Sequence, residues 1–413
     1  MSDSKPVAKS SMLTVDEALS CLLGRADPVT GVETVETIAA QGRVLAEPQC
    51  SQLDVPPLDN SSMDGYAVRL ADMNAAGSTR LPVSQRIPAG QVGAALIPGT
   101  AARIFTGAPI PPGADAVVMQ EECTADGDSV VISRAPKVGE NIRRAGEDIR
   151  TGAQILAAGT RIGPAAMGLV ASVGIARLPV YRKLRVATFY TGDEIVMPGQ
   201  PLAPGQIYNS NRYILTGLLQ SIGCEIIELG NIPDNLDETV RALSQAAARA
   251  DLVITSGGVS VGEEDHVKAA VEQVGSLDLW RIAMKPGKPL AFGNARGTPF
   301  IGLPGNPVSA FVTFCLFVRP FILRRQGVLE IAPRSFKVRA DFSWPKAGTR
   351  REYLRVRLQQ GEDGTVGVSL FPNQGSGVLT SVAWGDGLVD IPVGDTVQPG
   401  QLVRFIPFSE LIG

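Results

Sequence analysis

Apolar runs alternate with amphipathic segments along residues 183–327, and this alternation is the strongest structural signal in the sequence. The continuous apolar runs, which are typical of buried strands, cover residues 184–189, 225–229, 251–255, 279–284 and 299–303. The segments with apolar residues at helical spacing cover residues 212–222, 236–249, 266–274 and 307–325. Alternation of this kind predicts a doubly wound, mostly parallel sheet with helices on both faces.

The chain on either side of this segment has the pattern of β structure. Between residues 54 and 140, short β-like runs such as 116–120 and 129–133 lie between turns rich in Gly and Pro, as in all-β modules. Further β-like runs after residue 332 suggest a small C-terminal β-barrel. They cover residues 335–342, 351–359, 365–370 and 402–406. By contrast, the pattern of residues 13–23 predicts a helix, with Thr14 as its N-cap.

Length and composition narrow the class of protein. At 413 residues the chain is too long for one core, which suggests two to four domains. A net charge of −3 argues against a nucleic-acid surface, and no apolar run reaches membrane-spanning length, so we expect a cytoplasmic protein. Its five cysteines contain no CxxC pair and fit reduced thiols. The single histidine, His266, excludes a His-rich zinc site and leaves the chemistry to carboxylates, lysines, backbone dipoles and a bound metal.

The segment SGGVSVGEED, residues 256–265, combines a glycine-rich turn with three consecutive acids. Its glycines allow backbone N–H groups to converge on an anion at the start of a helix. The acids Glu263, Glu264 and Asp265 make sense beside an anion if a divalent metal lies between them. A second interpretation is equally open here, a tight strand-to-helix connection whose acids interact with the helix dipole.

Polar or Gly/Pro-rich loops follow the predicted strands, at residues 191–194, 232–235, 256–265, 285–289 and 303–307. Because ligands bind outside the carboxyl ends of strands in open α/β sheets, we expect these loops to form one site. In the loop KPGKP, two prolines hold Lys285 and Lys288 at a fixed separation, which suits an oxyanion or pyrophosphate. Plainer interpretations also exist: Asp234 could cap the following helix, and TGD could be a simple turn.

Further polar segments lie upstream, at residues 58–67, 105–109 and 139–150. Each could be a solvated turn or part of a ligand-binding surface, and spacing alone does not choose between these interpretations.

Taken together, these segments resemble the molybdopterin molybdenumtransferase family, which includes the E domain of gephyrin. The matching strings occur in family order and cover roughly residues 12–410. They are DNSSMDGYA, FTGAPIPPGADAVV, GENIRRAGEDI, TGDE, GQIYNSN, SGGVSVGEED, MKPGKP, LPGNPVSA, REYLRVRL and GSGVLTSVAWGDGL.

The resemblance implies a multidomain α/β plus β protein that forms an elongated homodimer. A discontinuous N-terminal α+β domain is expected at residues 12–53 and 141–178, interrupted by a β domain at residues 54–140. An α/β molybdopterin-binding domain, similar to the molybdopterin adenylyltransferases, is expected at residues 179–330. A β-barrel would follow at residues 331–413.

The resemblance also implies a role in molybdenum cofactor biosynthesis. Family members insert molybdenum from molybdate into the dithiolene of adenylylated molybdopterin, with Mg²⁺ and release of AMP. The expected partners are a molybdopterin adenylyltransferase and downstream proteins that mature the cofactor, with no nucleic acid and no membrane. Two alternatives are adenylyl transfer itself and a non-catalytic scaffold that retains the fold. The additional domains favour insertion over adenylyl transfer, and retention of Asp265, Lys285 and Lys288 argues against a scaffold.

Matching positions carry the family's expected roles. Glu194, Asp234 and Asp265 would bind Mg²⁺ or substrate, and Lys285 and Lys288 would hold molybdate or phosphate. The implied catalytic residues are Asp59, Thr106, Glu194, Asp265, Lys285 and Lys288, the first two reaching the site from the β domain of a partner subunit. The implied cofactor-binding residues are Asp64, Ser256, Gly257, Gly258, Ser260, Pro304, Gly305, Asn306 and Pro307.

Two positions depart from the family pattern. Tyr190 precedes TGDE where serine is common, and we expect it to alter the floor of the pocket. His266 follows Asp265 where tyrosine is frequent, and we expect it to be a structural or surface residue rather than a catalyst.

Overall fold

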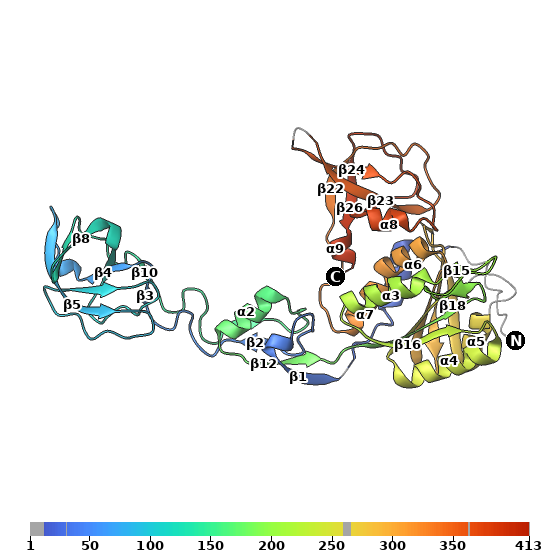
Figure 1. Ribbon diagram of the computed structural model, residues 1–413, viewed down its shortest axis with the longest axis horizontal. Coiled ribbons are helices and arrows are strands. Elements are labelled where there is room, and N and C mark those ends of the chain that lie inside the picture. The colour runs from blue at the N-terminus through green and yellow to red at the C-terminus, as the bar shows by residue number, and fades with distance from the viewer. Residues whose placement is uncertain (1–11, 30, 259–265, 362–363, 413) are drawn as a thin grey trace, which may run out of the picture.

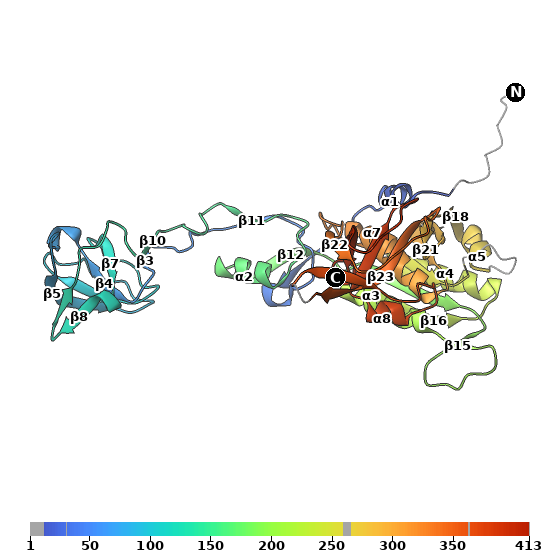
Figure 2. The same ribbon diagram turned by 90° about the horizontal axis from the view of Figure 1, so that it is seen from above.

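The computed structural model describes residues 12–29, 31–258, 266–361 and 364–412. The chain is extended: a β module lies at one end, a small α+β region in the middle, and the α/β module and barrel together at the other end (Figure 1). The view from above shows the same separation (Figure 2). The predicted fold class is confirmed, whereas the residue boundaries of the domains stay predictions.

The α/β module is built on a six-stranded mixed sheet. Its strands are, in spatial order, β16 (Glu225–Ile232), β13 (Arg185–Thr191), β17 (Leu252–Ser256), β21 (Thr298–Leu303), β20 (Pro289–Ala295) and β18 (Gly275–Arg281). Neighbours among the first four pair in parallel, and β20 and β18 join by antiparallel pairing at one edge. The mostly parallel sheet expected from the alternating pattern is therefore present, with an antiparallel edge added.

Helices cover both faces of this sheet. One face packs against α1 (Val15–Leu23), α3 (Ser210–Ser221), α6 (Pro307–Thr313) and α7 (Arg319–Arg325), and the other against α4 (Leu236–Arg249) and α5 (His266–Val274). Because strand side chains alternate between faces, Val186 and Tyr190 join the core with α3, whereas Ala187 and Phe189 join the core with α4. The doubly wound arrangement follows from this division.

Residues 307–325 form one continuous helical segment, in which the π-helical turn η4 (Phe314–Val318) joins α6 to α7. Among the described residues it is the one helix long and apolar enough to cross a membrane, judged by length and composition alone. Within its most apolar window, 83% of the segment is buried inside the protein. Its apolar side chains are thus accounted for by the core of the α/β module.

The β module at the far end is a second six-stranded sheet. Its spatial order is β7 (Ala116–Met119), β4 (Gly65–Val68), β6 (Ala101–Ile104), β5 (Thr79–Ile87), β9 (Ser129–Ile132) and β8 (Cys123–Asp126). Next to it, β3 (Asn60–Ser61) pairs with β10 (Ile142–Arg143). The all-β pattern predicted for residues 54–140 is borne out by these strands.

The middle region joins segments that are far apart in sequence. Here β1 (Val32–Glu36) pairs antiparallel with β12 (Arg177–Tyr181), β2 (Gln49–Cys50) pairs with β11 (Gln154–Leu156), and α2 (Pro164–Ser172) packs beside them. Helix α1 does not belong to this cluster. Thr14 caps α1 as predicted, accepting a hydrogen bond from the Glu17 N–H at 3.2 Å, and Val15 and Leu22 pack into the α/β core.

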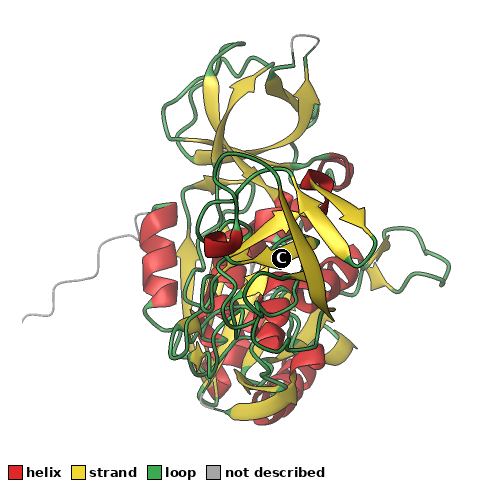
Figure 3. Cartoon of the chain, turned by 90° about the vertical axis from the view of Figure 1, so that its left-hand side faces the viewer, coloured by secondary structure: helices red, strands yellow, loops and turns green. Residues whose placement is uncertain are grey.

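The C-terminal region is a closed barrel. Its strands are β23 (Arg351–Gln360), β24 (Val366–Leu370), β22 (Phe336–Ala340), β26 (Leu402–Pro407) and β25 (Gly387–Ile391), and pairing of β23 with β25 closes the ring. Short helices α8 (Thr380–Trp384) and α9 (Phe408–Leu411) lie beside it. Figure 3 shows the strands curving round one centre at the top of the molecule. The predicted barrel is therefore confirmed.

One ion cluster joins two neighbouring strands of the parallel sheet, β13 and β17. Arg182 donates two hydrogen bonds of 2.7 Å to the carboxylate of Asp251, and the backbone N–H of Arg185 donates a third at 2.8 Å. Burial alone would raise the pKa of Asp251, but these hydrogen bonds outweigh burial and hold its pKa well below the usual range. The carboxylate is therefore charged in the folded protein, and it ties the start of β13 to the start of β17.

We expect Asp251→Asn to destabilise the protein by about 3 kcal/mol at neutral pH, because it leaves Arg182 without its anion. A lowered folded-state pKa stabilises the fold fully above the unfolded-state value of about 3.9, and this contribution is lost as the pH falls towards the folded-state pKa. The difference between the thermal melts of wild type and variant should thus be several degrees at pH 7 and should shrink steadily as the pH falls below about 4. The exposed Asp395 gives a control, Asp395→Asn, and an equal effect of both substitutions would contradict the assignment.

Candidate functional site

A cavity of about 770 Å³ opens at the carboxyl ends of β13, β17 and β21. Turns that follow these strands form one wall, and the barrel contributes Arg350 and residues 374–376 to another. This is the position at which open α/β sheets bind ligands. All five loops singled out in the sequence supply residues to this one cavity.

Most of the predicted site residues of the α/β module line the cavity. They are Glu194, Asp234, Ser256, Gly257, Gly258, Lys285, Lys288, Pro304, Gly305, Asn306 and Pro307. The structure thus assembles the predicted set, although the roles expected for the individual residues stay predictions.

The described part of the glycine-rich turn can be formed only by glycine. Gly257 and Gly258 have φ values of +95° and +64°, a region that side chains other than glycine rarely adopt. A Cβ added at Gly258 would lie 2.5 Å from the side chain of Val267 and 2.9 Å from Thr191 Oγ1. The turn therefore passes close to the end of the neighbouring strand β13 and to the following helix α5, and both of its glycines line the cavity.

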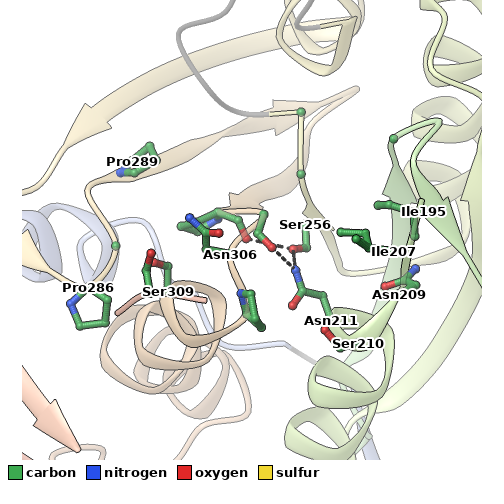
Figure 4. Close-up of a pocket in the computed structure, with 18 of the residues that line it drawn as sticks. Ile195, Ile207, Asn209, Ser210, Asn211, Ser256, Pro286, Pro289, Asn306 and Ser309 are labelled. Atoms are coloured by element: carbon green, nitrogen blue, oxygen red, sulfur yellow. Dashed lines mark hydrogen bonds between the residues drawn. The ribbon is translucent and has the colours of Figure 1, made fainter. Parts of the chain in front are cut away.

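A small hydrogen-bond network joins two of the loops to the start of α3 (Figure 4). The Asn211 side-chain amide donates to Ser256 Oγ at 2.8 Å and to the Gly305 carbonyl at 2.7 Å. Ser256 Oγ in turn donates to the Pro304 carbonyl at 3.0 Å. Because Asn211 comes from the start of α3, this network fixes the glycine-rich turn, the LPGNP turn and the helix relative to one another.

The KPGKP loop carries both lysines of the described cavity lining. Gly287 has a φ of +91°, and a Cβ there would lie 2.6 Å from Thr313 Oγ1, so the loop packs directly against α6. The side chain of Lys285 is 45% exposed, and Lys288 is exposed as well. Both therefore present ammonium groups to the cavity from a loop that is held in place by packing.

The barrel wall was not anticipated from the sequence. The Gln374 amide bonds to the backbone N–H and C=O of Arg355 at 2.9 and 3.0 Å. Arg355 is 1% exposed, and its guanidinium donates hydrogen bonds to the Gly375 carbonyl and to Ser381 Oγ. Burial lowers the pKa of Arg355 to about 10. Ser376 accepts a hydrogen bond from the Val308 N–H at 3.0 Å. Residues 374–376 are thus rigidly placed against the start of α6.

Two further groups of lining residues had no assigned role. They are Ile195, Ile207 and Tyr208 at one rim, and Asn209, Ser210 and Asn211 at the start of α3. The string GQIYNSN contains most of them and was the one available signal. Gly375 and Ser376 belong to the matching string GSGVLTSVAWGDGL, whereas Arg350 and Gln374 have no local signal, since only the docking of the barrel brings these residues to the cavity.

The predicted residues of the β module do not line the cavity. Thr106 donates from its N–H and its hydroxyl to Asp64 Oδ1, both at 2.8 Å, and the backbone hydrogen bond is the main cause of a lowered pKa for Asp64. Asp59 accepts from the Ala145 N–H at 2.8 Å, which likewise lowers its pKa. All of these residues belong to the distant end of the same chain (Figure 1).

Ser260 and Asp265, together with Glu263 and Glu264, lie outside the described residues.

Tyr190 is 1% exposed and belongs to the main core, where burial raises its pKa to about 12. It is absent from the described lining, so the expectation that it alters the pocket floor is not supported. His266 is the first residue of α5 and does not line the cavity either.

The described residues contain no group of three or more His, Cys, Asp or Glu side chains placed to hold a metal ion. Glu194 and Asp234 nevertheless line the same cavity. Since Mg²⁺ is commonly held by one or two carboxylates together with waters and substrate phosphate oxygens, this donor set fits a substrate-bridged Mg²⁺.

Three family profiles match the chain in succession. They are the MoeA N-terminal region (domain I and II) at residues 13–174, a probable molybdopterin binding domain at residues 187–324, and the MoeA C-terminal region (domain IV) at residues 337–408. The β module and middle region, the α/β module and the barrel correspond to these profiles in order.

Whole proteins and solved structures give the same result. The molybdopterin molybdenumtransferase of Haemophilus influenzae is 42% identical over 97% of this chain and 100% of its own length, and that of Nostoc sp. is 40% identical over 91% and 88%. A crystal structure of the molybdopterin biosynthesis MoeA protein from Pyrococcus horikoshii OT3 aligns with a TM-score of 0.82 and 29% identity, covering 96% of this chain and 100% of that one. With such identity along nearly its whole length, the chain belongs to the molybdopterin molybdenumtransferase family.

Proposed function

We propose that this protein inserts molybdenum from molybdate into the dithiolene of adenylylated molybdopterin and releases AMP. The observation that carries the proposal is the cavity itself, in which a stiff loop with Lys285 and Lys288 shares one space with Glu194 and Asp234. A tetrahedral oxyanion and a pyrophosphate linkage both require this combination of fixed cations, backbone donors and carboxylates that can hold a metal.

Each group has a task in this proposal. Lys285 and Lys288 would neutralise the oxygens of molybdate or phosphate, and the turn at Gly257 and Gly258 would approach the pyrophosphate closely. Glu194 and Asp234 would hold Mg²⁺, with Asp265 as a further expected ligand outside the described residues. When bound, the ion would offset charge on the phosphate oxygens as the linkage is broken.

The barrel wall favours insertion over the alternative of adenylyl transfer. A site for adenylyl transfer needs only the α/β module, whereas this cavity is completed by Arg350 and residues 374–376 from the barrel. The barrel wall also argues against a scaffold without catalysis. Arg355 is buried beneath this wall and holds residues 374–376 rigidly in place, which a protein-binding surface would not need.

A homodimer is part of the proposal. Asp59, Asp64 and Thr106 lie on a module far from the cavity of their own chain (Figure 2), so a second copy would have to supply them. The proposed setting is the cytoplasm, with a molybdopterin adenylyltransferase as the source of substrate and proteins of cofactor maturation as recipients.

The direct test supplies purified protein with adenylylated molybdopterin, molybdate and Mg²⁺. We expect AMP release and activation of a molybdenum-free apoenzyme, both dependent on molybdate. Formation of adenylylated molybdopterin from molybdopterin and ATP would instead support adenylyl transfer, and no turnover in either assay would leave a scaffold.

We expect Lys288→Ala to raise the molybdate concentration for half-maximal turnover at least about tenfold, because an ammonium beside a bound oxyanion contributes 1.5–3 kcal/mol. Steady-state kinetics with varied molybdate measure this change. The matched control is Lys337→Ala, which removes an exposed lysine of the barrel outside the cavity. Equal half-saturation values for both variants would remove Lys288 from the oxyanion site.

Mixed dimers test the contribution of the β module. At molybdate well below the wild-type half-saturating concentration, we expect Asp59→Asn and Lys288→Ala each to lose most turnover. Co-expression of the two should restore about a quarter of it, since half of the dimers would be mixed and each would keep one intact site. AMP release measures recovery, and light scattering measures the mass. A monomer, or no recovery in verified mixed dimers, would contradict a site shared between subunits.

A further inference from the structure

The lysine loop belongs to two domains at once. Strand β19 (Met284–Lys285) pairs in parallel with β23 of the barrel, which places Met284 opposite Arg351 and Lys285 opposite Glu352. The Arg351 N–H donates to the Ala283 carbonyl at 2.9 Å, next to this pair. Lys285 therefore leaves the α/β sheet and becomes part of the edge of the barrel.

The carboxylate of Glu352 is buried behind Lys285. Glu352 is 8% exposed, and its Oε2 lies 3.6 Å from Lys285 Nζ. That oxygen accepts no hydrogen bond from any described residue. Its other oxygen packs against Gly348, where an added Cβ would approach within 2.7 Å. Lys285 is thus the described cation that compensates a carboxylate withdrawn from water.

Lys285 and Lys288 are held differently. The Lys285 ammonium lies between Glu352 and the ring of Trp344, whose centroid is 5.9 Å away, while its open side faces the cavity. For Lys288, by contrast, the described residues provide no ion pair or side-chain hydrogen bond. Among the described residues Lys285 is the one cation paired with Glu352, and a buried carboxylate deprived of its cation is costly, which favours a single location for the Lys285 ammonium.

We propose that Glu352 is a positioning residue that acts through Lys285, and that the barrel thereby sets where one of the oxyanion-binding cations stands. The proposal deepens the proposed function and rests on it for its catalytic consequence. Fixing a cation before substrate binds preserves transition-state stabilisation that a mobile lysine would lose. Glu352 is not among the described residues that line the cavity, so any effect on the reaction has to pass through Lys285.

The neighbouring residue of β23 provides a matched control. Arg351 forms an ion pair with Asp390, which is 5% exposed. Asp390 also forms an ion pair with Arg404, and all three residues belong to barrel strands. Asp390→Asn thus removes a buried barrel carboxylate without touching Lys285. It should lower thermal stability and leave turnover by the folded enzyme unchanged.

The functional test is a double-mutant cycle on the full-length protein, read by AMP release at saturating substrates. We expect Glu352→Gln to lower turnover about tenfold, as misplacement of a catalytic group commonly does. In the Lys285→Ala background the same change should alter turnover less than about twofold, because the residue through which Glu352 acts is gone. Glu352→Asp, which keeps the charge, should retain more turnover than Glu352→Gln.

A second readout does not depend on activity. Acetylation of lysines with an amine-reactive ester, followed by peptide mass spectrometry, reports how freely each ammonium reacts. We expect Glu352→Gln to speed labelling of Lys285 about threefold, the effect of losing a partly exposed ion pair, while Lys288 in the same protein is unchanged.

The two readouts separate the possible failures. An unchanged labelling rate at Lys285 would overturn the inference whatever the activity, and so would equal effects of Glu352→Gln with and without Lys285. If Glu352→Gln speeds labelling of Lys285 but the wild-type protein inserts no molybdenum, the positioning contact stands and the proposed function is removed instead.

Discussion

The parallel pairing of β19 with β23 is the contact on which the rest of the site depends. It takes a loop that begins at the carboxyl edge of the α/β sheet and joins it by backbone hydrogen bonds to the barrel. Because such hydrogen bonds are directional, they fix the barrel over the strand ends. The hydrogen bond between the Val308 N–H and the Ser376 carbonyl secures the opposite side. A rim that would otherwise open to solvent becomes a cavity with two walls.

Charged side chains, backbone dipoles and neutral hydrogen bonds organise the described part of the cavity. The single histidine of the chain, His266, stands at the start of α5 and outside the described lining. Neutral hydrogen bonds around Asn211 and Ser256 lock the glycine-rich turn to the LPGNP turn. Donors fixed in advance need not reorganise when charge develops on a substrate, which suits phosphate and oxyanion chemistry.

The extended shape separates the tasks of the chain. The middle region connects the β module to the α/β module through short antiparallel pairs such as β1 with β12, so the two ends of the molecule make no shared core (Figure 2). Asp59 and Asp64 are held locally by backbone N–H groups of Ala145 and Thr106. The β module is thus a rigid carrier of polar residues, and its distance from the cavity is the structural basis for expecting a second copy.

Local patterns in the sequence determined the elements of this protein. Helix α4 forms at the predicted residues 236–249 because Asn235 caps it and one apolar stripe faces the sheet. The loops of the carboxyl edge were predictable because strand ends in a parallel sheet share one rim.

Tertiary structure decided what lies opposite that rim. The strand expected at 279–284 became β18 at 275–281 and a separate β19, because pairing with β20 and β23 set its register. Arg350, Glu352 and residues 374–376 reach the lysine loop only through docking of the barrel, a long-range contact that leaves no periodic signal in the chain.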